Sequence, residues 1–212
     1  MELKVVEYSA ARTRVLDAAL RLFAGHGVSA TSLQMIADAV GITKAAVYHQ
    51  FPTKDRIVLA VTERELARLI PALEDAEDRS HAAEARDALL AGVIDMAVRD
   101  RRLVRTLQFD PVVVRLLAEH EQFQHFMSRL YRVLLGELDD DGRVAGAMLS
   151  GAISTAVMHP LVADIDDETL RAKVIEMTRR IIGTSTGEGA QKSARSGVSA
   201  DRHARSPRKS GR

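Results

Sequence analysis

The stretch from Thr31 to Phe51 constrains the fold more than any other part of this sequence, because small and apolar residues recur in it at a demanding spacing. Ala37 suits a point where two helices cross closely. Gly41 suits a tight turn that requires a positive φ angle. Val47 suits an apolar anchor that faces back toward the first helix. Another kind of helical hairpin could share any one of these features, but the three together predict a helix-turn-helix, whose second helix enters the major groove of DNA.

Hydroxyl side chains stand where the helices of this motif would begin. Thr31 and Ser32 are both candidate N-caps for a helix that ends at Gly41. Thr43 can cap the next helix, from Lys44 to about Gln50. A proline ends that helix, since the residue before a proline is pushed out of the α region.

The rest of the chain also has the pattern of helices. Apolar residues make up 46% of the 212 residues, aromatic residues only 4%, and there is no Trp, which favours helices packed on helices. Apolar periodicity predicts helices at about 11–24, 54–78 with a kink or break at Pro71, 82–101, 112–120, 121–138, 143–159 and 166–183, and a short apolar segment at 103–109. The predicted fold class is all-α, with an N-terminal three-helix helix-turn-helix domain joined to a larger helical-bundle domain.

Charge and composition suggest three parts. Residues 1–54, the predicted DNA-binding domain, carry a net charge of +2, and residues 55–183, the predicted helical bundle, carry −6. Residues 184–212 carry +5 and contain one bulky apolar residue, Val198, so we expect a disordered basic tail. The two ends therefore suit a polyanion and the middle does not.

Several classes of protein are disfavoured. The chain has no Cys, no run of about eighteen apolar residues and no signal-peptide pattern, so we expect a cytoplasmic protein without disulfides and without a membrane partner. His120 and His125 are five residues apart and would point to different faces of a helix, so we expect no metal site. No catalytic constellation stands out, and we expect no enzyme and no cofactor.

Residues 12–59, about a quarter of the chain, resemble the DNA-binding domain of TetR-type repressors. The ending Tyr48-x-x-Phe51-x-x-Lys54 is the most specific part, whereas Ala45 and Gln50 depart from the glycine and histidine common in the family. The resemblance implies that residues 55–183 form a variable helical domain for ligand (effector) binding and dimerisation, that the protein is a homodimer, and that it releases DNA when a small molecule binds. The matching stretches are residues 14–27 (RVLDAALRLFAGHG), 31–41 (TSLQMIADAVG) and 42–54 (ITKAAVYHQFPTK).

The resemblance also assigns candidate DNA contacts on the second helix and at two helix starts. Tyr48 would offer its hydroxyl to a phosphate and its ring to a thymine methyl group. Lys54 is alternatively a solvated lysine, and Arg12 and Arg14 either reach a phosphate or lie on ordinary surface. Phe51 is expected in the core. The candidate DNA-binding residues are Thr31, Thr43, Lys44, Ala45, Tyr48, His49 and Lys54.

Apolar and soft side chains on the middle helices suggest a pocket for an unidentified small apolar effector. The alternative for each of them is plain core. Gln108, Asp110, His125 and Ser154 could orient such a ligand. The candidate pocket residues are Met96, Leu107, Gln108, Phe109, Phe123, Phe126, Met127, Tyr131 and Met148.

Small residues between Ala145 and Val157 indicate close helix contact. By resemblance, the last two helices would pair across a two-fold axis. A contact within one chain is the alternative. The candidate interface residues are Ile153, Val157, Leu170, Val174, Ile175 and Ile182.

These observations favour a ligand-responsive, homodimeric repressor that a small molecule releases from a palindromic operator in double-stranded DNA. The alternative is a constitutive architectural DNA-binding protein without a ligand, in which the basic tail dominates. A small-molecule enzyme on this scaffold is a third possibility, for which no ordered constellation is visible.

Overall fold

The computed structural model describes residues 7–78 and 82–182, and for Ala82, Arg102 and Leu107 it describes only the backbone. The predicted tail at 184–212 lies outside the described residues. Every regular element in the described part is a helix, as the all-α class predicts. The helices are α1 (Ala10–His26), α2 (Leu33–Val40), α3 (Lys44–Gln50), α4 (Lys54–Leu66), η1 (Ala67–Leu69), α5 (Ile70–Glu77), α6 (Ala82–Arg99), α7 (Arg101–Phe109), α8 (Pro111–Glu119), α9 (Glu121–Leu135), α10 (Asp140–Met158), η3 (Pro160–Val162) and a helix over residues 167–182.

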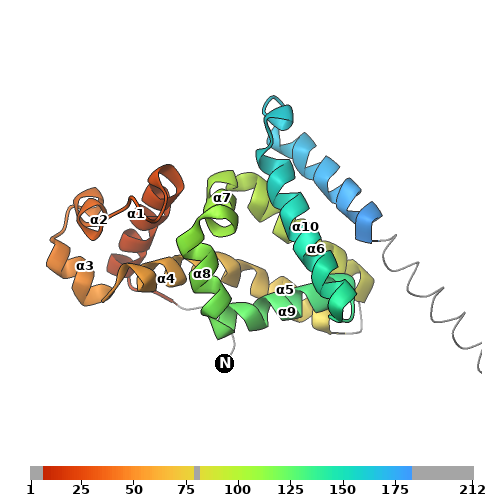
Figure 1. The fold of residues 1–212 in the computed structure, drawn as a ribbon, viewed down its shortest axis with the longest axis horizontal. Helices are drawn as coiled ribbons and strands as arrows, with labels where there is room; N and C mark the ends of the chain where they lie inside the picture. The colour runs from red at the N-terminus through yellow and green to blue at the C-terminus, as the bar shows by residue number, and fades with distance from the viewer. Residues whose placement is uncertain (1–6, 79–81, 183–212) are drawn as a thin grey trace, which may run out of the picture.

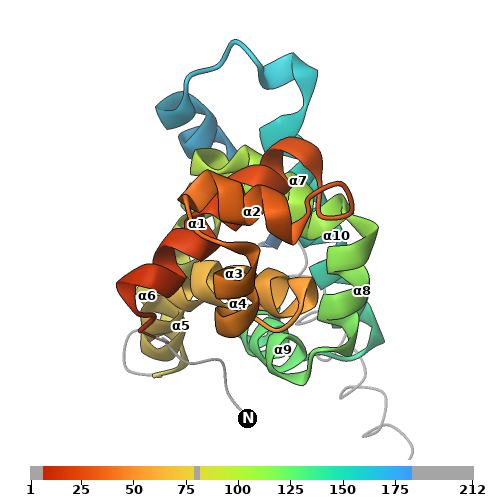
Figure 2. The ribbon, with the colours of Figure 1, turned by 90° about the vertical axis from the view of Figure 1, so that its left-hand side faces the viewer.

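Two groups of helices make up the molecule. The head, α1 to α3, lies at one end in Figure 1, and α4 runs from it into a bundle formed by α5 to α10. At the opposite end, α10 lies beside the helix over residues 167–182. Turning the molecule so that the head faces the viewer places α2 and α3 in front of the bundle (Figure 2).

N-capping side chains and one glycine determine where the helices of the head begin and end. Ser32 begins α2 by accepting a hydrogen bond from the amide of Met35, and Thr43 begins α3 in the same way through Ala46. Gly41 ends α2 in the left-handed conformation, with φ of 75°, which an L side chain adopts only at a cost. The predicted turn is confirmed, whereas of the two candidate caps for α2 only Ser32 has this role.

The predicted helix at 54–78 is broken rather than continuous. The short 3-10 helix η1 separates α4 from α5, and Pro71 lies in the first turn of α5. A proline has no amide hydrogen to donate, so it is tolerated in the first turn of a helix and not in its interior. The predicted segment at 103–109 is a full helix, α7, capped by Asp100, and the helix expected to reach residue 138 ends at Gly136, with φ of 92°.

Apolar side chains form two cores. The first joins α1, α2, α3 and α4 and receives Val113 and Leu117 from α8, and the second fills the bundle. Four residues of α4 beyond Lys54 belong to the first core, which therefore extends past the predicted domain boundary: they are Ile57, Val58, Ala60 and Val61. Within the described ranges, no helix has both the length and the apolar character needed to cross a membrane.

Candidate DNA interface and ligand cavity

Helix α3 presents one face to the head and the other to solvent. Val47 is fully buried among the helices of the head, and this fixes the rotation of α3 about its own axis. Five predicted contact residues are consequently exposed on or beside the outer face: Thr43, Lys44, Ala45, Tyr48 and His49. The structure thus brings these five together on one surface.

Tyr48 is the largest side chain on this surface. It is 47% exposed, and the ammonium nitrogen of Lys44 lies 5.7 Å from the centre of its ring. This cation–π geometry holds the two side chains together on the first and second turns of α3. The pair offers a positive charge, a hydroxyl group and an apolar ring edge, which suit a phosphate and a thymine methyl group.

Thr31, a predicted DNA contact, has a buried side chain. Its side chain is 1% exposed, and its hydroxyl group donates a hydrogen bond of 2.8 Å to the carbonyl of Gly27. A hydroxyl in this position cannot reach a phosphate, and the exposed hydroxyl at the start of α2 is that of Ser32. Two neighbouring hydroxyl residues look alike in sequence, and only the path of the loop decides which one faces inward.

Lys54, the second predicted contact at the start of a helix, bonds to its own chain. Its ammonium group donates to three carbonyls of the loop between α1 and α2, at 2.8 Å to Val28, 3.1 Å to Thr31 and 3.4 Å to Ser29. An ammonium group has three hydrogens, so these bonds use all of its donors. Lys54 therefore ties the start of α4 to this loop and is not available to a phosphate in this conformation.

Arg12 joins α1 to the end of α3. Its guanidinium donates to the carbonyl of Gln50 at 2.9 Å and lies 5.2 Å from the centre of the Phe51 ring. Phe51 is buried in the core of the head, as the sequence predicts. Arg14 is exposed. Arg12 therefore has a structural partner, although its side chain remains largely in solvent.

The bundle contains an apolar cavity of about 120 Å³. It lies among helices from distant parts of the sequence, and its walls carry far more carbon than oxygen or nitrogen. Its lining residues are Leu66, Leu69, Val93, Met96, Ala97, Val104, Gln108, Leu117, Phe123, Met127, Leu130, Tyr131, Leu134, Leu149, Ser150, Ile153 and Ser154.

The cavity includes part of the predicted pocket. Its lining contains five of the nine predicted residues: Met96, Gln108, Phe123, Met127 and Tyr131.

Three predicted pocket residues lie elsewhere. Phe126 is buried in the bundle core and does not line the cavity, whereas Phe109 is 55% and Met148 is 70% exposed. Each of these helices offers more than one apolar face, and periodicity alone does not tell which face meets the cavity. The side chain of Leu107 lies outside the described residues.

Of the four polar residues predicted to orient a ligand, two line the cavity and two do not. Gln108 and Ser154 line the cavity. Asp110 instead caps α8, and His125 is exposed on α9. His120 caps α9 through the amide of Phe123, and its Nε2 lies 3.3 Å from a carboxylate oxygen of Glu63 on α4.

The predicted dimer residues face inward, which is a further correction. Ile153, Val157, Leu170, Val174, Ile175 and Ile182 are all buried in the core of their own chain. Their periodicity marks the inner face of an amphipathic pair of helices, and sequence alone cannot tell this face from an interface. On the outer side of the same helices, exposed apolar residues are Val144, Met148, Met177 and Ile181.

An open apolar groove runs between these two helices. Ala152 and Ala156 of α10 form one wall, and Met177 and Ile181 of the helix over residues 167–182 form the other. Leu161 of η3 stands exposed at one end. Small residues on α10 keep this groove wide enough for an apolar side chain from outside to enter.

Two polar contacts from α7 and its end hold the head against the bundle. Arg105 donates a hydrogen bond of 2.9 Å to the carbonyl of Ala24, in the last turns of α1. The carboxylate of Asp110 accepts a bond of 2.8 Å from the amide of Val28, and its other oxygen caps α8 through Val112. Helix α7 also lines the cavity with Val104, so one helix contacts both the head and the cavity.

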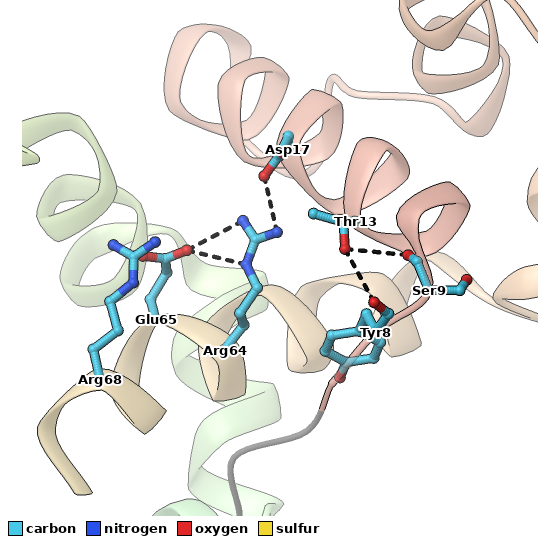
Figure 3. Close-up of polar contacts among 7 residues, drawn as sticks. All are labelled: Tyr8, Ser9, Thr13, Asp17, Arg64, Glu65 and Arg68. Atoms are coloured by element: carbon cyan, nitrogen blue, oxygen red, sulfur yellow. Dashed lines mark hydrogen bonds and ion pairs between the residues drawn. The ribbon is translucent and has the colours of Figure 1, made fainter. Parts of the chain in front are cut away.

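A third contact lies on α4 (Figure 3). Arg64 reaches Asp17 of α1 at 2.8 Å and Glu65 at 3.1 Å, while Arg68 holds the other oxygen of Glu65 at 2.7 Å. Glu65 is only 2% exposed, and a buried carboxylate requires such partners. The next residue, Leu66, lines the cavity, so α4 also connects the two regions.

Comparisons with known proteins point to one family. The model of the bacterial regulatory proteins of the tetR family matches residues 15–61, which cover α2, α3 and most of α1 and α4. The HTH-type transcriptional regulator AcrR of Shigella flexneri is 46% identical over 52 residues, or 24% of each chain. The HTH-type transcriptional repressor AcnR of Corynebacterium diphtheriae is 25% identical over 147 residues, which are 64% of this chain and 72% of that protein.

The likeness of fold extends over most of the chain. The solved SmeT–triclosan complex superposes with a TM-score of 0.60 at 23% sequence identity, covering 81% of this chain and 91% of that one. The head therefore matches in sequence and fold, and the bundle matches mainly in fold.

Proposed function

Because the chain belongs to the TetR family of bacterial regulatory proteins, we propose that it is a homodimeric repressor, which a small molecule releases from a palindromic operator. The family is one of transcriptional regulators and not of enzymes. The exposed face of α3 carries this proposal, because Val47 and the Thr43 cap hold Lys44 and Tyr48 outward from the head.

DNA recognition would use this face of α3. Lys44, Tyr48 and His49 are exposed side chains that can reach phosphates and base edges. Ser32 replaces Thr31 as the hydroxyl at the start of α2, and Lys54 supports the interface by ordering the loop before α2. A single head offers few contacts, so a second copy of α3 in the next major groove would raise both affinity and specificity.

The dimer would form through the outer faces of α10 and the helix over residues 167–182. Met148, Met177 and Ile181 are exposed there, beside an open apolar groove. Burying this face against a second copy would remove apolar surface from water. The interface proposed from the structure is therefore the opposite side of the helices from the one proposed from the sequence.

Ligand response is supported by the cavity in the bundle. The SmeT–triclosan complex shows that a protein of this fold binds a small molecule. Here the cavity is lined by Leu66 of α4 and Val104 of α7, the two helices that also contact the head. A ligand that displaces either helix would change the position of the head, and operator affinity would fall by linkage.

Selection of DNA from a random pool by the purified protein tests the proposal. We expect the bound sequences to share two inverted half-sites, whose centres lie about 34–36 Å apart along the duplex. The protein should form dimers at the concentration used, as light scattering would show. Diffuse, strongly salt-dependent coating without a shared sequence would contradict a repressor and support the architectural alternative.

A further inference from the structure

Every residue that lines the bundle cavity is uncharged. Within the described part of the chain its walls contain no Asp, Glu, Lys, Arg or His, and the polar side chains are limited to Gln108, Tyr131, Ser150 and Ser154. A ligand with a formal charge would lose its hydration here without gaining an opposite charge, which is costly. The cavity therefore favours a neutral molecule.

The polar side chains are gathered rather than scattered. Ser150 and Ser154 are four residues apart on α10 and so share one face of that helix. Gly146, a further four residues back, lies under the ring of Tyr131, and a Cβ atom there would come within 3.2 Å of that ring. The small residues of α10 thus make room for the tyrosine of α9 at one edge of the cavity.

Hydrogen bonds orient this edge. The amide nitrogen of Gln108 donates to the hydroxyl of Ser150 at 2.7 Å, and Ser150 is hydrogen-bonded to the hydroxyl of Tyr131. A serine hydroxyl donates one hydrogen bond and accepts up to two, so Ser150 can donate its own hydrogen to Tyr131 while it accepts from Gln108. In that arrangement the hydrogen of Tyr131 is available to a ligand.

Burial keeps the hydroxyl group of Tyr131 protonated. Desolvation raises the pKa of Tyr131 above its ordinary value, and the hydrogen bond from Ser150 offsets only part of this rise. The phenol is therefore protonated throughout the physiological pH range. A protonated tyrosine can donate one hydrogen bond to a ligand, which a deprotonated one could not.

Ser154 supplies the complementary group. It is 4% exposed and lines the cavity, so its hydroxyl can donate a hydrogen bond to a ligand and accept one from it. Together, Tyr131 and Ser154 suit a group that both accepts and donates a hydrogen bond.

The volume limits the ligand's size. The cavity measures about 120 Å³. An engineered apolar cavity of about 150 Å³ in another protein holds one benzene molecule. In this conformation the bundle therefore has room for a ligand of about one ring.

We propose that the effector is a neutral, ring-sized apolar molecule that carries one hydroxyl group, held between Tyr131 and Ser154. This assignment rests on the proposed ligand response and names its chemistry. The hydroxyl accepts from Tyr131 and donates to Ser154, while the ring packs against Phe123, Met127 and Leu130.

Phenol, toluene and benzoate test this chemistry, because they have similar size and differ in polarity and charge. Met96 and Met127 line the cavity and Met148 does not, so methionine methyl NMR signals of the full-length protein report where each molecule binds. We expect phenol to shift the signals of Met96 and Met127 and to leave Met148 unchanged. Toluene should bind more weakly than phenol, and benzoate should cause no shift at matched concentration.

Two conservative variants separate the hydrogen bonds from the cavity itself. Tyr131→Phe and Ser154→Ala should each weaken phenol binding about two- to tenfold, the loss expected for one hydrogen bond, and leave toluene binding unchanged. Tyr8→Phe and Thr155→Ala are matched controls outside the cavity lining and should leave both affinities unchanged.

Equal binding of phenol and toluene would overturn the proposal, and so would binding of benzoate or absence of all three from the cavity. Equal weakening of phenol and toluene by Tyr131→Phe would also contradict it, because that result indicates a structural role for the hydroxyl. These outcomes are independent of the DNA selection described above, which tests the proposed repressor function by itself.

Discussion

The head and the bundle specify their functional surfaces in different ways. The exposed face of α3 depends on residues close together in sequence, from the Gly41 turn and the Thr43 cap to the Val47 anchor. The cavity in the bundle collects side chains from Leu66 on α4 to Ser154 on α10, nearly ninety residues away. A short motif can therefore place the first surface, whereas the second exists only after the whole bundle has packed.

The head and the bundle should therefore respond to different kinds of mutation. The head should be sensitive to backbone conformation at its turn, because caps and a positive φ angle set the direction of α3. The bundle should be sensitive to the volume of its core side chains, because their packing defines the cavity. The contacts from Arg105, Asp110 and Arg64 link the two, so damage at these residues should appear in both regions.

The largest expected effect is in the bundle core. Phe126→Ala should lower the free energy of unfolding by about 3–5 kcal/mol, because it removes a fully buried ring and leaves a void. Phe109→Ala is the matched control, since that ring is largely exposed, and it should cost no more than about 0.5 kcal/mol. Urea denaturation at fixed protein concentration measures both, and equal losses would contradict the packing described for the bundle.

A loss of intermediate size is expected where the two regions meet. Asp110→Ala removes the partner of the Val28 amide and the cap of α8, and should cost about 1–3 kcal/mol. Asp139→Ala removes only the cap of α10. Hydrogen exchange should then show faster exchange of the Val28 amide in the first variant and not in the second. Unchanged protection of Val28 in both would show that Asp110 does not hold the head.

The turn of the head gives a smaller effect. Gly41→Ala should cost about 1–2 kcal/mol, because a left-handed residue acquires a side chain. Gly25→Ala lies inside α1 and should instead raise stability by up to about 1 kcal/mol. A Cβ atom at either position meets no other atom within 4 Å, so thermal unfolding of the pair isolates the backbone effect. Equal changes in the two variants would rule out strain at the turn.

The smallest expected effect concerns a pair on the surface of the bundle. Arg129 holds Glu77 in a two-pronged contact of 2.9 and 2.6 Å, and this hydrogen bonding lowers the pKa of Glu77 below its ordinary value. A lowered pKa means that the pair stabilises the folded state above the ordinary glutamate value and loses this contribution as the pH falls through the folded pKa. Glu77→Gln should therefore cost less than about 1 kcal/mol at pH 7, since solvent screens the pair.

The same variant should cost nothing in strong acid, where Glu77 is protonated in both states. Stability measured between pH 7 and pH 2 checks this dependence, with Glu74→Gln on the exposed side of α5 as the control. A difference between Glu77→Gln and the parent protein that persists at pH 2 would assign the effect to packing instead of charge.

Much of the head could be predicted from the sequence because its rules are local. The Thr43 cap, the Gly41 turn and burial of Phe51 follow from residues within a few positions of one another. The sequence did not predict that the Thr31 side chain is buried or that Lys54 bonds to the loop before α2. Their positions depend on how the loop after α1 folds back over the start of α4, which no local pattern specifies.

In the bundle, periodicity predicted the helices better than it predicted their faces. The apolar stripe that includes Val157 and Leu170 is the inner face of its two helices. Only the packed structure shows that the side bearing Met148 and Met177 is exposed. Ser150 gave no signal in the sequence, because a serine on a helix becomes notable only when it meets Gln108 and Tyr131 from other helices.

Equilibrium binding of Tyr48→Ala to the selected operator tests most directly whether the exposed face of α3 reads DNA. Tyr48 is half exposed, so its removal should change the free energy of unfolding by no more than about 0.5 kcal/mol and leave the dimer intact. Operator affinity should fall at least about tenfold, as expected for the loss of a specific contact. An intact, dimeric variant that binds the operator as tightly as the parent protein would contradict the assignment of α3 as the recognition helix.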